Sequence, residues 1–384
     1  MIFEEKQKSQ PIDKRQVREA FQKVRSNGGA SGVDKMSIKE VSLQARKYLY
    51  PVWNRLASGS YYPKAVREVA IPKFDGRVRK LGIPTVQDRT AQMVIREELE
   101  TIADKHFSAS SYGYRPHKSA HQAIRQCREN CMKMDWAIDL DIKSFFDEID
   151  HELMMKALSR FTDKKHIHLY VKRWLEAPIQ KKDGTIEKRV KGTPQGGVIS
   201  PLLANIFLHF VFDKWLEKYH PQVKFERYAD DFSIYLRSKK AAKRVGNSIY
   251  KFLRDKLQFP INREKSGIRK PLDFQVLRFG FVPTYKKGEK GKYQLVAGLS
   301  KWKEFEAKLK HLTKKTIPAN FEECIQRINL LLRGWINYFK PTSIQGKLKK
   351  LEEWLRNRLR YCIWSRSFGR KSPNENGKIL FDWV

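Results

Sequence analysis

The chain has few cysteines and no long apolar run, and each scarcity excludes a class of protein. Four cysteines occur among 384 residues, at positions 127, 131, 324 and 362, and none forms a Cys-x-x-Cys pair. A zinc module is therefore not expected, and scattered cysteines fit a reducing, cytoplasmic compartment. The longest apolar run, residues 201–212, contains Asn205 and His209 and is too short to span a bilayer, so no membrane partner is expected.

Targeting and nucleotide-binding signatures are also missing. The segment from Met1 to Lys6 lacks an apolar stretch after a basic one, so we expect no signal peptide. Neither a Walker loop nor a Gly-x-Gly-x-x-Gly string occurs, which argues against a helicase or a dinucleotide enzyme.

Negative charge is scarce as well. The chain has 42 Asp and Glu against 78 Lys and Arg, a formal net charge of +36. Apolar residues make up 41%, too many for a disordered basic tail. A folded protein with this charge attracts polyanions, of which nucleic acid is the first candidate. The length predicts about two or three domains.

Hydrophobic periodicity predicts a mixed α+β chain. Strands are expected over 66–71 and 136–142, hairpins over 224–236 and around 182–185, and short strands over 273–298. Helices are expected over 11–26, 38–57, 86–104, 119–134, 150–160, 163–176, 200–219 and 239–257. Ser200-Pro201 predicts a helix start with the Ser200 hydroxyl as its cap. Three further helical patterns lie within 286–384, where 23 Lys and Arg face 9 Asp and Glu, a net charge of +14.

Two acidic pairs carry candidate chemistry. The predicted strand 136–142 alternates, so Asp139 and Asp141 face away from the core, and Asp230-Asp231 lies in the middle of a predicted hairpin. Surface or turn carboxylates are the alternative, because turns favour Asp. Mg²⁺ prefers oxygen ligands, and two ions about 4 Å apart can activate a 3′-hydroxyl and stabilise a departing pyrophosphate. Asp141 and Asp230 are 89 positions apart, enough to lie on adjacent strands.

A glycine-rich segment lies between the two pairs. Residues 191–205 read Lys-Gly-Thr-Pro-Gln-Gly-Gly-Val-Ile-Ser-Pro-Leu-Leu-Ala-Asn. Glycine lets the backbone approach a ligand closely, and Gln195 offers both a donor and an acceptor. An ordinary loop before a helix is the alternative.

These three strings, in this order, resemble the palm of a reverse transcriptase, and more closely the group II intron-encoded reverse transcriptases, also called maturases. The resemblance covers roughly residues 15–366 and includes further strings at 71–73, 79, 81–85, 88–89, 111–116 and 333–339. It implies an α+β right-hand polymerase with fingers and palm, an antiparallel sheet flanked by helices, and a three-helix thumb. The implied domains are an N-terminal extension and template lid (1–35), fingers and palm (36–285), thumb (286–366) and a vestigial DNA-binding tail (367–384).

The resemblance also assigns roles to individual residues. It implies that Asp141, Asp230 and Asp231 are catalytic, and that Asp141, Ile142 and Asp230 hold two Mg²⁺ ions, with Mn²⁺ as a substitute. Phe146 matches the bulky residue that rejects a 2′-hydroxyl, and the 27–34 loop matches a template lid. The implied dNTP-binding residues are Lys73, Arg79, Arg115, Ile142, Phe146 and Gln195. The implied nucleic-acid-binding residues are Tyr228, Lys265, Gly334, Trp335, Lys349, Lys350 and Arg356.

The function implied is RNA-directed DNA polymerisation from a primer 3′-end, with an RNA template, a DNA or RNA primer, dNTPs and a group II intron RNA as partners; a dimer is left open. Departures from the family pattern occur at Lys80, His117 and 277–281. We expect no nuclease segment and only a vestigial DNA-binding region, so recognition of a target DNA is left open. Two alternatives remain: a free-standing enzyme of DNA repair or phage defence, and a non-catalytic RNA-binding splicing factor. The intact aspartates argue against the second.

Overall fold

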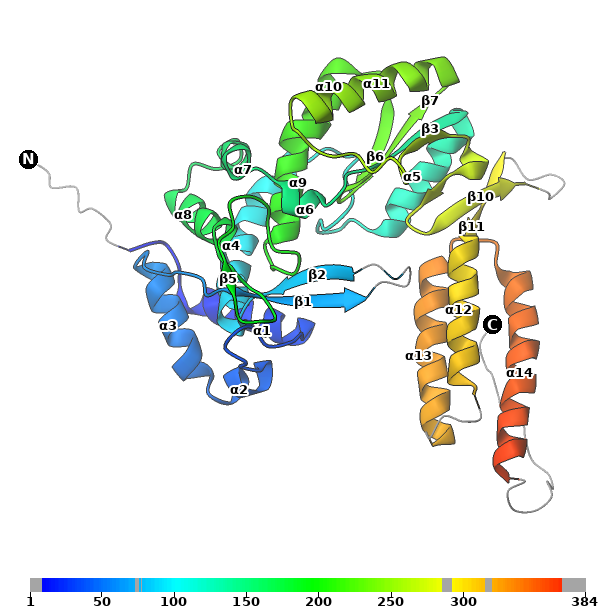
Figure 1. The fold of residues 1–384 in the computed structure, drawn as a ribbon, viewed down its shortest axis with the longest axis horizontal. Helices are drawn as coiled ribbons and strands as arrows, with labels where there is room; N and C mark the ends of the chain where they lie inside the picture. The colour runs from blue at the N-terminus through cyan, green and yellow to red at the C-terminus, as the bar shows by residue number, and fades with distance from the viewer. Residues whose placement is uncertain (1–8, 73–75, 77, 285–291, 315–319, 368–384) are drawn as a thin grey trace, which may run out of the picture. The chain divides into compact units, whose positions relative to one another are not determined.

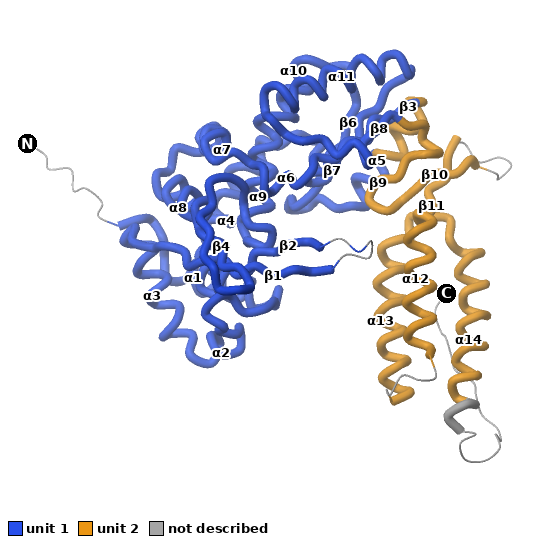
Figure 2. The backbone as a smooth tube through the Cα atoms, in the orientation of Figure 1, with its two compact units in different colours: residues 1–126, 136–268 blue, residues 127–135, 269–384 orange. Residues whose placement is uncertain are grey.

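The computed structural model describes residues 9–72, 76, 78–284, 292–314 and 320–367. Two compact units are present: residues 1–126 with 136–268, and residues 127–135 with 269–384 (Figure 2). The predicted boundary at 285–286 falls within the second unit, between two strands that pair with each other, β10 (Phe279–Pro283) and β11 (Tyr293–Ala297).

The first unit begins with three helices: α1 (Lys14–Asn27), α2 (Ile38–Leu43) and α3 (Ala45–Ala57). Helix α1 buries Val17, Phe21 and Val24 and packs against α3 and α4 (Val86–Ala103). The prediction of one helix over 38–57 is wrong, because Gln44 has a non-helical backbone (φ −124°, ψ 42°) that separates α2 from α3.

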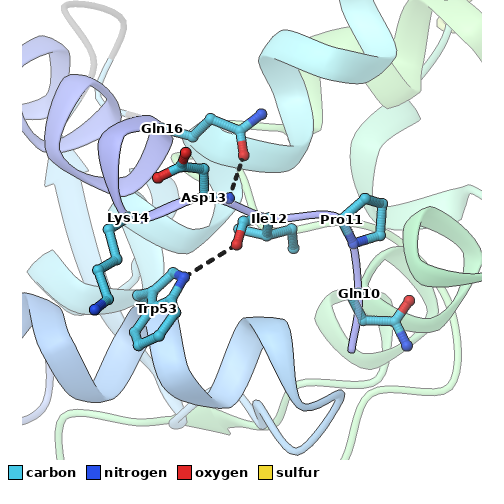
Figure 3. A pocket seen from close by; sticks show the side chains of 7 residues that line it. All are labelled: Gln10, Pro11, Ile12, Asp13, Lys14, Gln16 and Trp53. Atoms are coloured by element: carbon cyan, nitrogen blue, oxygen red, sulfur yellow. Dashed lines mark hydrogen bonds between the residues drawn. The ribbon is translucent and has the colours of Figure 1, made fainter. Parts of the chain in front are cut away.

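The segment before α1 is fixed to α3. The Trp53 indole Nε1 donates to the carbonyl oxygen of Ile12 at 3.0 Å, and the Lys14 ammonium lies 4.3 Å from a Trp53 ring centroid. Asp13 caps α1 in a capping box with Gln16. Figure 3 shows these side chains around an open pocket that residues 10–14, Gln16 and Trp53 line. The extension is therefore packed onto the first unit along its described length.

Two sheets organise the rest of this unit (Figure 1). One has the order β2-β1-β4-β5, formed by β1 (Val66–Pro72), β2 (Val78–Ile83), β4 (Ile179–Gln180) and β5 (Ile186–Glu187). The other has the order β6-β7-β3-β8, formed by β3 (Trp136–Asp141), β6 (Lys224–Tyr228), β7 (Asp231–Leu236) and β8 (Gly267–Arg269). Both hairpins predicted at 182–185 and 224–236 are confirmed.

Helix α11 (Lys239–Asp255) packs against β3 and β7. The helices α6 (Phe145–Glu148), α7 (His151–Leu158), α8 (Lys165–Leu175), α9 (Ser200–Leu208) and α10 (Lys214–Tyr219) add buried residues to the core of this unit. The short helix η1 (Asp104–His106) follows α4, and α5 (Ala120–Lys133) passes from the first unit into the second after residue 126. A π-helical turn, His209–Asp213, interrupts the helix predicted over 200–219. Ser200 is not the cap: Ile199 precedes the helix, and the Ser200 hydroxyl instead lies 2.9 Å from the Thr193 hydroxyl.

The second unit combines a small sheet with the three predicted helices. Its strands have the order β11-β10-β9, with β9 at Gln275–Val276 after the short helix η3 (Pro271–Asp273). The helices are α12 (Leu299–Leu312), α13 (Phe321–Phe339) and α14 (Gln345–Ser367), and their shared core includes Phe305, Leu309, Ile328, Leu355 and Leu359. Within the described ranges, every helix is too short or too polar to cross a membrane.

Candidate active site

Asp141 and Asp231 are direct cross-strand partners at one end of the β6-β7-β3-β8 sheet. Residues opposite each other in an antiparallel pair project to the same face, so both carboxylates belong to one surface. Tyr228 pairs with Asp231 in the other ladder, which leaves Ala229 and Asp230 as a two-residue turn. Ala229 has a left-handed backbone (φ 58°), a conformation typical of tight hairpin turns. The sheet thus brings the two predicted acidic pairs together.

The carboxylates influence one another. Burial and the Asp141 carboxylate raise the pKa of Asp230. Desolvation, followed by the charges of Asp230, Asp141 and Asp139, raises the pKa of Asp231 to about 7. The nearby ammonium of Lys265 lies 3.5 Å from Asp141 Oδ2 and is half exposed. Negative charge is therefore concentrated here beyond what the neighbouring lysine offsets.

The segment after α11 holds Asp141 in place. Asn262 Nδ2 donates to Asp141 Oδ2 at 2.8 Å, and the Asn262 backbone N–H donates to the Asp141 carbonyl at 2.9 Å. The Asp141 N–H donates to Ser266 Oγ at 2.9 Å. Asn262 and Ser266 were not predicted as site residues, although both lie within three positions of the predicted residue Lys265. The Ile142 side chain is buried in the core, so only its main-chain carbonyl could serve as a ligand.

The donor set fits a divalent cation that also binds substrate. Among the described residues, no group of three His, Cys, Asp or Glu side chains could hold a metal ion by itself. Mg²⁺ is usually bound by one or two carboxylates together with substrate phosphates and water. The raised pKa values of Asp230 and Asp231, to which neighbouring carboxylates contribute, fit a site whose charge a cation would offset.

A fully buried ion pair lies behind the Ala229–Asp230 turn. Arg227 Nε and Nη2 donate to the two carboxylate oxygens of Asp213 at 2.8 and 2.7 Å, and both side chains have no exposed surface. Arg227 Nη1 also donates to Asn205 Oδ1 at 2.8 Å and to the Ala229 carbonyl at 3.0 Å. Asn205 Nδ2 donates to the Gly113 carbonyl at 2.7 Å. The pair thus links α9, the π-helical turn and the 108–115 loop to the turn that carries Asp230.

The glycine-rich segment meets the end of strand β2. Arg79 Nε donates to Gln195 Oε1 at 2.9 Å, and the Gly82 N–H donates to the Gln195 carbonyl at 2.9 Å. Gly196 has φ +128°, and a Cβ there would lie 2.6 Å from the Gly82 carbonyl oxygen. The structure therefore brings two of the predicted dNTP-binding residues, Arg79 and Gln195, into direct contact.

The first turn of the same segment supports Phe146. The Thr193 N–H donates to the Phe146 carbonyl at 2.7 Å, and a Cβ on Gly192 would lie 2.7 Å from the Asp147 carbonyl oxygen. Phe145 is buried against Phe207 and Phe259, whereas Phe146 is half-buried. Of the two adjacent aromatic rings, Phe146 is the one with a surface available to a ligand.

Comparison with known proteins identifies the family. Residues 71–281, more than half of the chain, match the family "Reverse transcriptase (RNA-dependent DNA polymerase)". The chain belongs to the reverse transcriptase family. Residues 302–377 match "Group II intron, maturase-specific domain", so this reverse transcriptase is of the group II intron-encoded, maturase type.

Curated relatives agree with this assignment. The chain is 33% identical to protein YkfC of Escherichia coli (strain K12) over 279 residues, which are 62% of this chain and 71% of YkfC. It is 35% identical to the group II intron-encoded protein LtrA of Lactococcus lactis subsp. cremoris over 210 residues, 54% of this chain and 34% of LtrA. It is 38% identical to the putative COX1/OXI3 intron 1 protein of Saccharomyces cerevisiae over 172 residues, 45% of this chain and 20% of that protein.

Arg115 does not fit its predicted role of binding dNTP. Its side chain is 7% exposed, and its Nε donates a hydrogen bond to Asp104 Oδ1 at 2.6 Å. Its other donors go to the carbonyls of Asp104, Ser108 and Ser111. A guanidinium with these partners holds its own loop together and is not available to a triphosphate. Lys73, also predicted to bind dNTP, lies outside the described residues.

Tyr114 lies near the candidate site and was not among the predicted site residues. It is 52% exposed and has a left-handed backbone (φ 55°). Burial and the charges of Asp230 and Tyr228 raise its pKa, while Arg79 acts in the opposite direction. The ring therefore lies near the carboxylates, Tyr228 and the Arg79–Gln195 pair. An aromatic residue directly after Gly113 was the available signal.

The 27–34 loop packs on the start of α4. Arg89 donates to the carbonyls of Gly28 and Ala30 at 3.1 and 2.8 Å, and Arg67 donates to the Ser31 carbonyl at 2.6 Å. The two arginines fix this predicted lid to the rest of the first unit. Whether it covers a template stays a prediction.

The residues predicted to bind nucleic acid in the second unit have different environments. Trp335 is a core residue, because its ring stacks on Phe305 at 4.4 Å and contacts Phe339. A Cβ on Gly334 would meet nothing within 4 Å, so this glycine lies open on α13. Lys349 and Lys350 are exposed, and Arg356 is paired with Glu352 one turn earlier.

Proposed function

We propose that this chain is an RNA-directed DNA polymerase that extends a primer 3′-end with dNTPs by a two-metal mechanism. One observation carries the proposal: the cross-strand pair of Asp141 and Asp231, next to Asp230, concentrates three carboxylates at the end of one sheet. In this assignment Asp141, Asp230 and the Ile142 carbonyl hold Mg²⁺. When bound, such ions lower the pKa of the 3′-hydroxyl and stabilise charge on the leaving pyrophosphate.

The chain's own residues would orient the nucleotide. Arg79 supplies a fixed cation for the triphosphate, and its bond to Gln195 fixes the amide that lines the nucleotide. Phe146 offers its half-buried ring as the surface that a 2′-hydroxyl would strike. Tyr114 and Tyr228 provide aromatic surface near the carboxylates for stacking. Lys265 is placed to contact a primer phosphate while it offsets charge on Asp141.

The template–primer would lie against helix α13. Gly334 is unfavourable in a helix by about 1 kcal/mol relative to Ala, and among the described residues nothing within 4 Å of its Cβ position requires a glycine. Glycine is useful where a backbone must come close to a partner. Leu330, one turn away, is 71% exposed. We assign this face of α13 to the sugar–phosphate backbone of the template–primer.

A second role, binding a group II intron RNA to assist splicing, is favoured by the match of residues 302–377 to the maturase-specific domain. The relatives named as intron-encoded proteins point the same way. The chain's net charge of +36 suits a large RNA partner.

The polymerase proposal is tested by primer extension on an RNA template annealed to a DNA primer. We expect dNTP incorporation that requires added Mg²⁺ and stops on chelation. Mn²⁺ should restore extension, because both ions take carboxylate and phosphate oxygen ligands. No incorporation with either ion, by protein that binds the template–primer, would contradict the proposal.

A further inference from the structure

A groove of about 760 Å³ lies between helices α12 and α14 of the second unit. Its floor is apolar and is formed by Ala307, Leu351 and the rings of Trp302 and Trp354. Four exposed lysines surround this floor: Lys303, Lys310, Lys347 and Lys350. No residue of α13 lines the groove, so it is a surface separate from the open Gly334 face.

The four groove lysines have no acidic partner in the part of the chain that the structure describes. The one carboxylate in the lining, Glu306, accepts a hydrogen bond from Trp302 Nε1 at 2.7 Å. Elsewhere on α12, Lys301 and Lys308 both pair with Glu304, at 2.8 and 2.9 Å. The same helix therefore pairs its lysines outside the groove with a carboxylate and leaves Lys303 and Lys310 at the groove without one.

The Lys347 ammonium illustrates how the charged edge and the aromatic floor combine. It lies 5.5 Å from the Trp302 ring centroid. Arg358 similarly lies 5.2 Å from the Trp354 ring, and Trp354 is half-buried. An apolar, aromatic floor between rows of cations matches a strand with exposed base faces and a charged backbone. A duplex offers the same phosphates but keeps its base faces stacked inside, so it could not use the floor.

We propose that the groove between α12 and α14 binds an unpaired segment of RNA, with bases against the half-buried Trp354 ring and phosphates at Lys303, Lys310, Lys347 and Lys350. The proposal rests on the proposed binding of intron RNA and names the surface and the RNA conformation involved. It divides the lysines predicted on α14: Lys350 belongs to the groove, whereas Lys349 does not line it.

The test uses the full chain and a fluorescent twelve-nucleotide oligouridine, with binding measured from low to high salt. Lys347→Gln/Lys350→Gln should weaken binding about tenfold and reduce the slope of log K against log salt by about 1.4, since each single-strand phosphate contact contributes about 0.7. Lys301→Gln/Lys308→Gln removes the same charge from paired lysines of α12 and should change neither quantity appreciably. Trp354→Leu should weaken binding and leave the slope unchanged.

Equal effects of the two lysine pairs would overturn the proposal, because net charge alone would then explain the binding. Equal losses for oligouridine and for a base-paired RNA would also overturn it. Polyglutamate binding that depends on Lys347 and Lys350 more than RNA binding does would assign the groove to an acidic protein segment instead. Primer extension at saturating primer separates the groove proposal from the polymerase proposal. If the parent extends primers but the Lys347→Gln/Lys350→Gln variant binds oligouridine as the parent does, only the groove proposal is contradicted. If that variant binds oligouridine more weakly but the parent does not extend primers, only the polymerase proposal is contradicted.

Discussion

Arg227 and Asp213 form a buried, two-bonded ion pair directly behind the turn that carries Asp230. The pair lies 14 residues apart in sequence and joins the π-helical turn to strand β6. Arg227 also donates a hydrogen bond to the Ala229 carbonyl, which connects the left-handed turn residue to the core. We therefore treat Arg227 as a positioning residue for the candidate active site.

Arg227→Met should lower the free energy of unfolding by about 3–5 kcal/mol, because it leaves the buried Asp213 carboxylate without its arginine partner and only His209 Nδ1, at 3.5 Å, beside it. Adding Asp213→Leu should restore most of that loss, since an apolar pair of similar volume is often tolerated. Primer extension should stay low in the double variant, because the Ala229 carbonyl still lacks its donor. Denaturant unfolding and extension assays measure the two effects. Recovery of both together would contradict the positioning role.

The same pair predicts a dependence of stability on pH. Burial alone would raise the pKa of Asp213, but Arg227 and His209 outweigh it and hold the pKa below its ordinary value. A depressed carboxylate pKa stabilises the fold above the unfolded value, near pH 4, and this contribution disappears as pH falls further. The parent should therefore lose more stability than Arg227→Met/Asp213→Leu between about pH 5 and pH 2. Parallel curves would show that the pair does not contribute.

Phe146→Ala should raise incorporation of ribonucleotides relative to deoxyribonucleotides, on the order of tenfold or more, because the ring surface that a 2′-hydroxyl would strike is removed. The adjacent Phe145→Ala is the control: its ring is 1% exposed in the core. That variant should lose about 3–5 kcal/mol of stability without a change in sugar discrimination. Competition assays with both nucleotide types give the ratio. An unchanged ratio for Phe146→Ala would make it a packing residue.

Gly334→Ala should stabilise the chain and weaken template–primer binding. The added methyl meets nothing within 4 Å, so helix propensity favours the variant by about 0.5–1 kcal/mol. The same methyl would hold a bound backbone away from α13. Gly346, near the start of α14, is also open and provides the matched control. Gly346→Ala should not reduce binding, and an equal result for the two variants would remove α13 from the nucleic-acid interface.

Local patterns were sufficient to predict much of this architecture. The alternation in 136–142 predicted strand β3 and the face of Asp141, and the Tyr228–Asp231 string predicted the hairpin. The three helices of the second unit follow from apolar residues three and four positions apart. These features depend on hydrophobic periods of two and 3.6 residues, which can be recognised in the sequence without knowledge of tertiary contacts.

Tertiary contacts account for what was not predicted. Arg115 and Arg227 are both arginines near family motifs, yet one closes a loop and the other is buried behind the turn. Trp335 belongs to the core although its neighbour Gly334 is open, because adjacent helical residues point in different directions. The break at Gln44 and the π-helical turn interrupt otherwise helical patterns. The spacing of residues in the sequence does not show which side chains will meet or where a helix will be interrupted.

The most direct measurement is primer extension by Asp230→Asn, with dNTPs and Mg²⁺ at saturating RNA template and DNA primer. The substitution keeps the side-chain volume and removes one charged ligand, and an amide binds Mg²⁺ more weakly than a carboxylate does. Asp255→Asn, at the exposed end of α11 and 25 positions after Asp230, removes the same charge. This variant should extend primers normally. We predict loss of extension by Asp230→Asn, with unfolding and template–primer affinity close to those of the parent. Extension within a few-fold of the parent would contradict the assignment of the carboxylates to catalysis.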